Sequence, residues 1–231
     1  DFGIHKVRFY TAAEGDNRKQ NDTLSIELIS KAYELGPVTG FSTSGSNFKL
    51  TCNKAQVMVD FYREDIFRIQ MSYNGEFTNP AGESIVINIP KGKTEVKYTD
   101  KGEYYLFSTT QISLRAYKNP LRFAMYKPDN TTVVWEESNG LTYGKETVQY
   151  LKRGANEYFY GGGMQNGRFS HRDKTILIRN GGGWEDGANP NPAPFYMSSK
   201  EYGALRNTFA PGSYSFTDTV RLLHSETRYD C

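Results

Sequence analysis

The stretch that decides the fold class reads AQVMVDFYREDIFRIQMSY and covers residues 55–73. In its first half Val57, Val59 and Phe61 occupy every second position, so in an extended chain their side chains point to one face. Phe67–Met71 repeats this alternation after a short, mostly polar interval. A period of two is typical of strands that bury one face. The stretch therefore predicts two neighbouring strands of an antiparallel sheet.

The same alternation continues outward from this stretch in both directions. Turn-forming pairs such as Asn74-Gly75 separate the alternating segments at the short spacing of sandwiches and barrels, not at the spacing of strand–helix–strand units. We therefore expect an all-β fold, an antiparallel β-sandwich. The expected strands are His5–Tyr10, Asn47–Cys52, Ala55–Tyr62, Asp65–Tyr73, Ser84–Ile89, Glu103–Thr109, Thr110–Tyr117 and Leu121–Tyr126.

One segment, Asp22–Pro37, does not fit this pattern cleanly. It has apolar residues at helical spacing, such as Leu24 and Leu28, and also at alternating positions, so helix and strand both stay open. The chain has no internal repeat and no long linker. We expect a single domain over residues 1–231, in which residues 1–46 are the less certain lead-in.

Composition argues against several classes of function. The chain has 28 Lys and Arg against 26 Asp and Glu, and a net charge of +2 provides no field that would hold nucleic acid. No apolar run reaches the roughly 18 residues of a membrane span. Two cysteines, Cys52 and Cys231, cannot form a disulfide framework. The start at Asp1 indicates a chain that was processed or cut from something longer.

Neither a metal site nor a cofactor site is predicted. The three histidines have no metal-ligand spacing. The cluster Gly161–Gly167 departs from the pattern of a dinucleotide-binding loop, because Asn166 stands where that pattern needs its third glycine. We interpret the cluster as a tight, crowded bend between strands. His171 lies in a polar segment, and we expect a surface turn there in preference to a catalytic role.

Paired carboxylates are the groups that cleavage of a glycosidic bond would need. The adjacent pairs Glu64-Asp65 and Glu136-Glu137 are expected to be solvated charges in turns. The third pair, Glu185-Asp186, follows Trp184 in a segment rich in glycine, asparagine and proline. An aromatic ring beside polar groups on such backbone is typical of a loop that contacts sugar. The chain is also rich in aromatic rings in general, with 17 Tyr and 14 Phe.

Three further motifs carry a family resemblance. They are the runs Glu157–Gly163, Ile178–Gly182 and Pro194–Asn207, which occur in this order. Together they resemble the Tyr-Gly-x-Gly turn, the Asn-Arg-Asp loop and the Pro-Phe-Tyr-(Met/Leu)-Ser strand in the N-terminal domain of glycoside hydrolase family 31. That family contains α-glucosidases, α-xylosidases and related enzymes. The resemblance extends over roughly residues 47–218.

The resemblance implies a galactose-mutarotase-like antiparallel β-sandwich that precedes a (β/α)8 barrel absent from this chain. In the family, two aspartates of that barrel catalyse a retaining reaction. The family's nucleophile signature, Trp-x-Asp-Met-Asn-Glu, has no match here, because the segments that start at Trp135 and Trp184 both fail it. We therefore expect no catalytic residue in this chain. Residues 154–218 would be the loop-rich part that faces the catalytic barrel.

The resemblance also suggests which residues contact substrate. A loop of this domain commonly reaches over the barrel mouth in the family, and Arg179-Asn180 matches its Arg-Asp pair with an amide in place of the carboxylate. This change puts plain α-glucosidase specificity in doubt. The implied partners are an α-linked oligosaccharide or glycoside and the downstream barrel, and export to the cell surface or medium is favoured. The expected substrate-binding residues are Asn180, Trp184, Glu185 and Asp186.

The leading hypothesis is therefore a non-catalytic N-terminal domain of a retaining α-glycosidase, and two other functions stay open. The first is a stand-alone carbohydrate-binding module, in which the aromatic rings form a platform. The second is a mutarotase-like epimerase, because the sandwich type is shared. It would use His171 as an acid together with Glu185 or Asp186.

Overall fold

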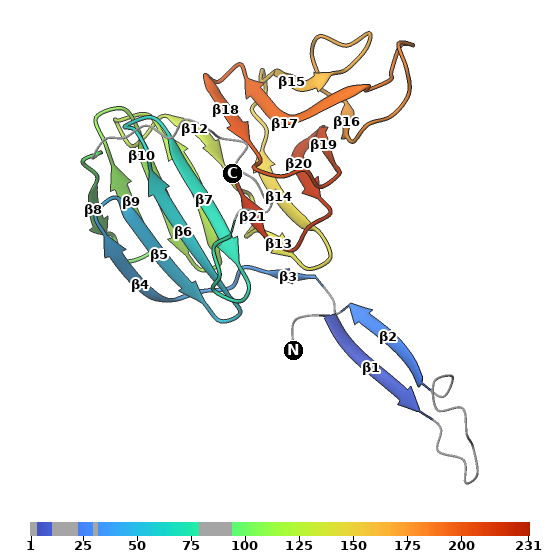
Figure 1. Ribbon diagram of the computed structural model, residues 1–231. Coiled ribbons are helices and arrows are strands. Elements are labelled where there is room, and N and C mark those ends of the chain that lie inside the picture. Colours follow the sequence, from blue (N-terminus) through green and yellow to red (C-terminus); the bar gives the residue numbers. More distant parts are fainter. Residues whose placement is uncertain (1–3, 11–22, 30–31, 79–93) are drawn as a thin grey trace.

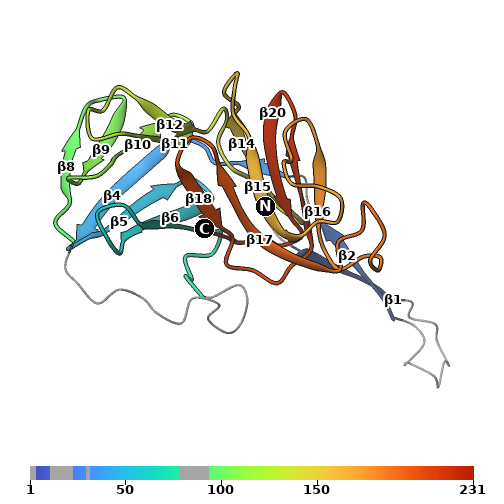
Figure 2. The same cartoon turned by 90° about the horizontal axis from the view of Figure 1, so that it is seen from above.

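The computed structural model describes residues 4–10, 23–29, 32–78 and 94–231. Every regular element in these residues is a strand, and every pairing between strands is antiparallel. The all-β prediction is therefore confirmed. Figures 1 and 2 show two packed bodies of sheet and, projecting from them, a two-stranded ribbon.

The first body, here called the first sandwich, consists of two five-stranded sheets made from consecutive hairpins, to which the C-terminal strand β21 adds beside β7 (Figure 1). One sheet has the order β21-β7-β6-β5-β4 and the other the order β12-β11-β10-β9-β8. The strands of the first sheet are β4 (Val38–Ser44), β5 (Asn47–Cys52), β6 (Ala55–Phe61), β7 (Phe67–Ser72) and β21 (Tyr229–Asp230). Those of the second are β8 (Lys97–Asp100), β9 (Tyr104–Ser108), β10 (Ser113–Lys118), β11 (Leu121–Tyr126) and β12 (Val133–Glu136).

The core of the first sandwich forms from the alternation that the sequence displays. In β6 every second residue is buried, and β5 presents Phe48 and Leu50 to the same layer. Across the sandwich, the ring of Phe107 lies 4.5 Å from that of Phe48, measured between centroids. Fully burying such a side chain contributes about 1.5–3 kcal/mol. The core residues thus hold the two sheets face to face.

The second body, the second sandwich, combines strands that are distant in sequence. A six-stranded sheet has the order β16-β19-β20-β14-β13-β3, and a three-stranded sheet has the order β15-β17-β18. Trp135 and Tyr202 pack against the cores of both sandwiches, so the two bodies adjoin. The strands are β3 (Tyr33–Glu34), β13 (Thr142–Tyr143), β14 (Thr147–Lys152), β15 (Phe159–Met164), β16 (Thr175–Ile178), β17 (Asn191–Ser198), β18 (Tyr202–Leu205), β19 (Gly212–Phe216) and β20 (Thr219–His224).

The projecting ribbon pairs β1 (Ile4–Tyr10) with β2 (Thr23–Ile29). Its second strand and β3 both lie in Asp22–Pro37, and the described residues of this segment contain strands and no helix, so the open question is answered in favour of strand. The apolar residues of this segment fit both helical and alternating spacing, and pairing with β1 selects the strand.

Most of the expected strands are confirmed, with shifts at their ends. The boundary predicted between Thr109 and Thr110 is instead a turn, in which the Thr109 hydroxyl accepts the backbone N–H groups of Gln111 and Ile112. β10 accordingly begins at Ser113. The expected strand Ser84–Ile89 lies outside the described residues.

The prediction for Glu136-Glu137 is wrong. Glu137 is 3% exposed, and its carboxylate accepts the Phe123 N–H at 2.7 Å and the Gln149 amide at 2.6 Å. Burial raises the pKa of Glu137 to about 7. An isolated bridge pairs Glu137 with Leu151 of β14, so β14 lies beside the end of β12 and covers the position that was expected to be solvated. Glu64-Asp65 is exposed as predicted.

Candidate functional site

The glycine cluster occupies β15 and forces a close approach to β17. Gly161 and Gly163 have φ values of 102° and 76°, and the register between the strands shifts between them. A Cβ at Gly163 would overlap the backbone of Asn191 and Ala193. The predicted crowding is confirmed, although the bend is a bulge within a strand and does not connect two strands.

The segment between β16 and β17, residues 179–189, forms a short closed loop that we call the arm. Its two ends are paired, because the Asn189 N–H donates to the Gly181 carbonyl at 2.9 Å and the Gly181 N–H donates back at 3.3 Å. The Gly182 φ of 75° and the Gly187 φ of 86° turn the chain within the loop. These glycines explain why this local sequence forms a loop and not a strand.

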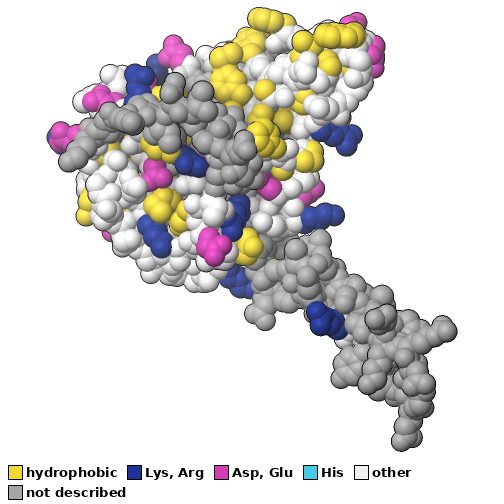
Figure 3. All heavy atoms as spheres, viewed as in Figure 1, with side chains coloured by type: hydrophobic (Ala, Val, Ile, Leu, Met, Phe, Trp, Pro, Cys, Tyr) yellow, Lys and Arg dark blue, Asp and Glu magenta, His cyan; other side chains and the backbone are white. Residues whose placement is uncertain are grey.

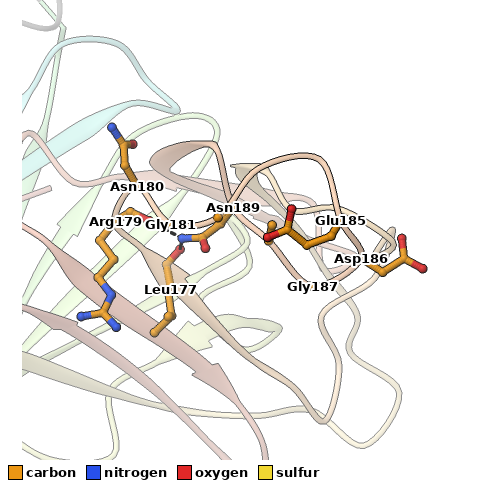
Figure 4. A pocket seen from close by; sticks show the side chains of 10 residues that line it. Leu177, Arg179, Asn180, Gly181, Glu185, Asp186, Gly187 and Asn189 are labelled. Carbon is orange, nitrogen blue, oxygen red and sulfur yellow. Dashed lines mark hydrogen bonds between the residues drawn. The ribbon is translucent and has the colours of Figure 1, made fainter.

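The arm encloses a shallow hollow of about 500 Å³. Three of the predicted substrate-binding residues, Asn180, Glu185 and Asp186, line this hollow. In Figure 4 the Asn180 side chain points away from the loop on one side and Asp186 points away on the other. The remaining lining residues are Leu177, Arg179, Gly181, Gly182, Gly187, Ala188 and Asn189.

Glu185 is engaged within the arm itself. Its two carboxylate oxygens accept the Gly183 N–H at 3.2 and 3.1 Å, and hydrogen bonds to backbone N–H groups lower its pKa. Trp184, the fourth predicted residue, does not line the hollow. Its side chain stays 79% exposed at the tip of the same loop. The structure therefore brings all four predicted residues onto one loop and three of them to one hollow.

Three amide side chains that the sequence-based prediction left out donate hydrogen bonds to carbonyls of the arm or of the strands at its base. Gln165, just after β15, donates to the carbonyls of Gly162 at 3.0 Å and Leu177 at 3.2 Å. Asn166 and Asn189 donate to carbonyls of the arm and its base, as described below. The available signal was the repeated occurrence of amides beside glycines in this part of the chain. The sequence alone does not tell which amides face the backbone.

The expectation that His171 lies in a surface turn is wrong. Its ring is 1% exposed, and Nε2 lies 2.8 Å from the Gly161 carbonyl. Burial lowers the pKa of His171, and the charged side chain that acts on it is Arg168, rather than either carboxylate of the arm. A buried imidazole that donates to backbone holds the glycine bulge in place. The geometry thus gives no support to an epimerase site.

Exposed apolar side chains gather around the arm. In β17, Phe195 and Met197 face outward while Tyr196 between them is buried. Phe169 is 86% exposed, and its ring lies 5.4 Å from that of Tyr160 in β15. Figure 3 shows hydrophobic side chains gathered over β15, β17 and β18. Patches of this kind mark surfaces that bind another molecule or domain.

The described part of the chain contains no group of three His, Cys, Asp or Glu side chains placed to hold a metal ion. Among the same residues, no helix has the length and apolar character needed to cross a membrane.

Comparison with known proteins gives relatives that are much longer than this chain. The α-glucosidase 2 of Bacillus thermoamyloliquefaciens is 28% identical over 190 residues, which make up 81% of this chain and 24% of that protein. A dextranase of Flavobacterium johnsoniae, complexed with isomaltotriose, has a TM-score of 0.77 at 19% identity, with 86% of this chain and 26% of that chain covered. A cycloalternan-forming enzyme of Listeria monocytogenes, complexed with a pentasaccharide substrate, has a TM-score of 0.74 at 17% identity. The match covers 90% of this chain and 21% of that chain.

The chain thus spans about a quarter of the length of these relatives. The structural likeness supports the sandwich architecture described above. A family model described as the glycosyl hydrolase 31 N-terminal galactose mutarotase-like domain matches residues 56–214, which include the arm and most strands of both sandwiches. The chain belongs to this family of N-terminal domains of glycosyl hydrolase 31 enzymes.

Proposed function

We propose that this chain is the non-catalytic N-terminal β-sandwich of a retaining α-glycosidase, and that its arm shapes the substrate subsites. The substrate is an α-linked oligosaccharide or glycoside. The catalytic carboxylates belong to a (β/α)8 barrel of the same polypeptide. Family membership supports the placement of the domain, and the geometry of the arm supports the role in substrate selection.

The position of Asn180 on the arm is the observation that carries this proposal. The residues on either side are hydrogen-bonded through their backbones, whereas the Asn180 side chain is exposed and points away from the loop (Figure 4). An amide can both donate to and accept from sugar hydroxyls. Because reaction rates respond to displacements of about 1 Å, a fixed amide next to the scissile bond can select among substrates.

Trp184 and Asp186 are the further candidates for direct contact with sugar. An exposed indole presents a flat apolar face to a sugar ring, and the exposed Asp186 carboxylate can accept from hydroxyl groups. Glu185 is the weaker candidate, because both of its oxygens already accept the Gly183 N–H.

The apolar surface over β15, β17 and β18 supports a second part of the proposal. We assign it as the surface on which the catalytic barrel packs, since the outward side chains of Phe195 and Met197 lie on β17, the strand into which the arm leads. A barrel packed on this face would lie beside the hollow. Residues 154–218 would then be the part of the chain that faces it.

The test uses the enzyme expressed from its complete reading frame. Asn180→Ala should change the ratio of kcat/KM between two α-glucosides that share the sugar but differ in leaving group, by about tenfold, because one hydrogen bond to substrate is lost. Asn53→Ala, in the exposed turn between β5 and β6 of the first sandwich, serves as the control and should leave the ratio unchanged. Equal kcat/KM ratios for the wild type and Asn180→Ala would contradict the proposal that the arm takes part in substrate selection.

A carbohydrate-binding module is the second candidate, and the exposure of Trp184 and Phe169 favours it. Titration calorimetry of the domain with maltose and isomaltose oligosaccharides separates the two functions. A module should bind measurably by itself and lose binding in Trp184→Ala. A loop that supplies only part of a subsite should show no binding when the domain is alone.

A further inference from the structure

The arm is tied down at the two positions that flank Asn180. The Asn189 side chain donates from Nδ2 to the carbonyl of Arg179, the residue before Asn180. The Asn189 backbone forms both hydrogen bonds to Gly181, the residue after it. The same Nδ2 also donates to the Leu177 carbonyl at 3.1 Å, at the end of β16. One residue thus holds the peptide units on both sides of Asn180.

The burial of Asn189 makes these hydrogen bonds difficult to replace with water. Asn189 is 5% exposed, whereas Asn180 and the tip of the arm are exposed. Figure 4 shows the Asn189 amide directed into the base of the loop, and the Asn180 amide directed outward. Removing one partner of a buried hydrogen bond leaves the other partner unsatisfied and destabilises the conformation that the bond holds.

A second amide supports the far side of the arm. Asn166 donates from Nδ2 to the carbonyls of Gly183 at 3.2 Å and Glu185 at 3.1 Å. Its backbone N–H donates to the Ala188 carbonyl at 3.0 Å, and its carbonyl accepts the Gly187 N–H at 3.1 Å. Because Asn166 follows the glycine bulge of β15, it connects the arm to the three-stranded sheet.

We infer that Asn189 is a positioning residue that fixes the place of Asn180, with Asn166 as its second support. The two asparagines hold the arm in one conformation before substrate arrives. The effect on substrate selection rests on the proposed function, whereas the fixing of the arm does not. The inference therefore has one consequence for the backbone and one for the enzyme's selectivity.

Asn189→Asp tests the inference with almost no change in shape. The aspartate carries oxygen where Asn189 carries its N–H donors, so it faces the carbonyls of Leu177 and Arg179 with no hydrogen to donate. In the full-length enzyme, hydrogen exchange measured by mass spectrometry should become about tenfold faster in peptides covering residues 179–189, and should stay unchanged in peptides of β5 and β6. Asn53→Asp, in the exposed turn between β5 and β6, is the control for the added charge.

The second measurement is selectivity between the same two α-glucosides. Asn189→Asp should shift the kcat/KM ratio in the same direction as Asn180→Ala, although Asn189 does not reach the substrate. The defect should shrink on acidification, because burial raises the pKa of the new carboxyl and its protonated form again has one donor. A general loss of stability would not produce this rescue together with an altered ratio.

The possible outcomes are distinct. Unchanged exchange in the arm overturns the inference whatever the enzyme does, and Asn166→Asp provides the same test if Asn189→Asp does not fold. Faster exchange with a shifted ratio supports it. Faster exchange with a ratio that changes in Asn180→Ala but not in Asn189→Asp overturns the positioning role. Faster exchange with no change of ratio in either variant supports the fixing of the arm and removes the proposed function.

Discussion

The two sandwiches of this molecule are stabilised in different ways. The first is made of consecutive hairpins whose alternating apolar residues meet in one core, with Phe48 and Phe107 in contact across it. The second joins strands that are distant in sequence, and it depends on glycine contacts and on polar groups such as His171. The candidate site lies on the second. Side-chain burial stabilises the first sandwich, whereas the second adds to its own aromatic core a close approach of backbones that only glycine permits.

The largest expected effect comes from breaking that backbone geometry. Gly163→Ala places a Cβ against the backbone of β17 and forces an alanine to adopt a φ of 76°. We expect a loss of about 4 kcal/mol or more, since neither backbone segment can move without breaking the pairing of β15 with β17. Chemical denaturation of the wild type and the variant measures the difference.

Gly102→Ala is the matched control in the first sandwich. Gly102 has a φ of 82°, but a Cβ there would have no atom within 4 Å. The control therefore contains only the cost of the left-handed conformation, about 1–2 kcal/mol. Equal losses of unfolding free energy in the two variants would mean that the close approach of β15 and β17 does not restrict the residue at position 163. The claim that the second sandwich requires glycine at this contact would then be wrong.

The pH dependence of Glu137 provides the next largest effect. Its folded-state pKa of about 7 lies above the ordinary value of 4.5, so the folded protein binds the proton more tightly. The resulting stability is fully present below pH 4.5 and is lost as pH rises through 7, by about 3 kcal/mol in total. Glu137→Gln should abolish this loss. Rotation of the Gln149 amide would let it accept from the new amide, so the Phe123 N–H keeps its acceptor.

Glu136→Gln, one position earlier, is the control for Glu137. Although burial opposes it, hydrogen bonds from Lys152 and Arg122 lower the pKa of Glu136, so Glu136 contributes stability that is present above pH 4.5 and is lost in acid. Glu136→Gln should remove only that contribution and keep the loss of stability as pH rises through 7. Unfolding by urea at a series of pH values from 4 to 8 measures both variants. A Glu137→Gln profile parallel to that of the wild type would contradict the assignment.

The sequence predicts the first sandwich better than the second, because the first depends on local alternation and the second on contacts between distant segments. Alternation in Asn47–Cys52 and Leu121–Tyr126 predicts strands with their bounds, because burial of one face needs only local order. Glu137 and His171 were misassigned because a sequence does not show which distant segments cover a polar residue in the folded chain, as β14 covers Glu137 and β15 contacts His171. The arm could be located from its glycines. The donors of Asn166 and Asn189 could not be assigned to carbonyls, because those bonds exist only after β15, β16 and β17 assemble.

The second sandwich should respond to acid in the direction opposite to Glu137. In His224, Nδ1 donates to the Ala210 carbonyl at 2.9 Å and Nε2 accepts the Tyr214 hydroxyl at 2.8 Å, an arrangement that requires the neutral ring. Burial lowers its pKa from 6.5 to about 4. The stability it contributes is present above pH 6.5 and is lost as pH falls through 4, by about 2 kcal/mol at pH 5.

Titration of the imidazole carbon-bound protons by NMR checks this expectation. Tyr214→Phe removes the donor that favours the neutral ring, so the pKa of His224 should rise in that variant. The losses at Glu137 and His224 have opposite slopes over the same pH range. Glu137→Gln should therefore reveal a rise of stability from pH 4 to 6.5 that the wild type conceals. A His224 signal that titrates near 6.5 would remove this source of acid sensitivity from the second sandwich.

The smallest expected effect is at the tip of the arm. Trp184→Ala removes the largest side chain of the loop, yet the free energy of unfolding should change by less than about 0.5 kcal/mol, because the ring is 79% exposed and buries little surface. Thermal unfolding of the domain measures this difference, with Trp135→Ala, whose ring packs against both cores, as the contrast. A large exposed aromatic side chain that contributes nothing to folding is most simply explained by contact with another molecule. A clear loss of stability in Trp184→Ala would instead make the ring part of the scaffold, and would weaken the case that the second sandwich bears the site.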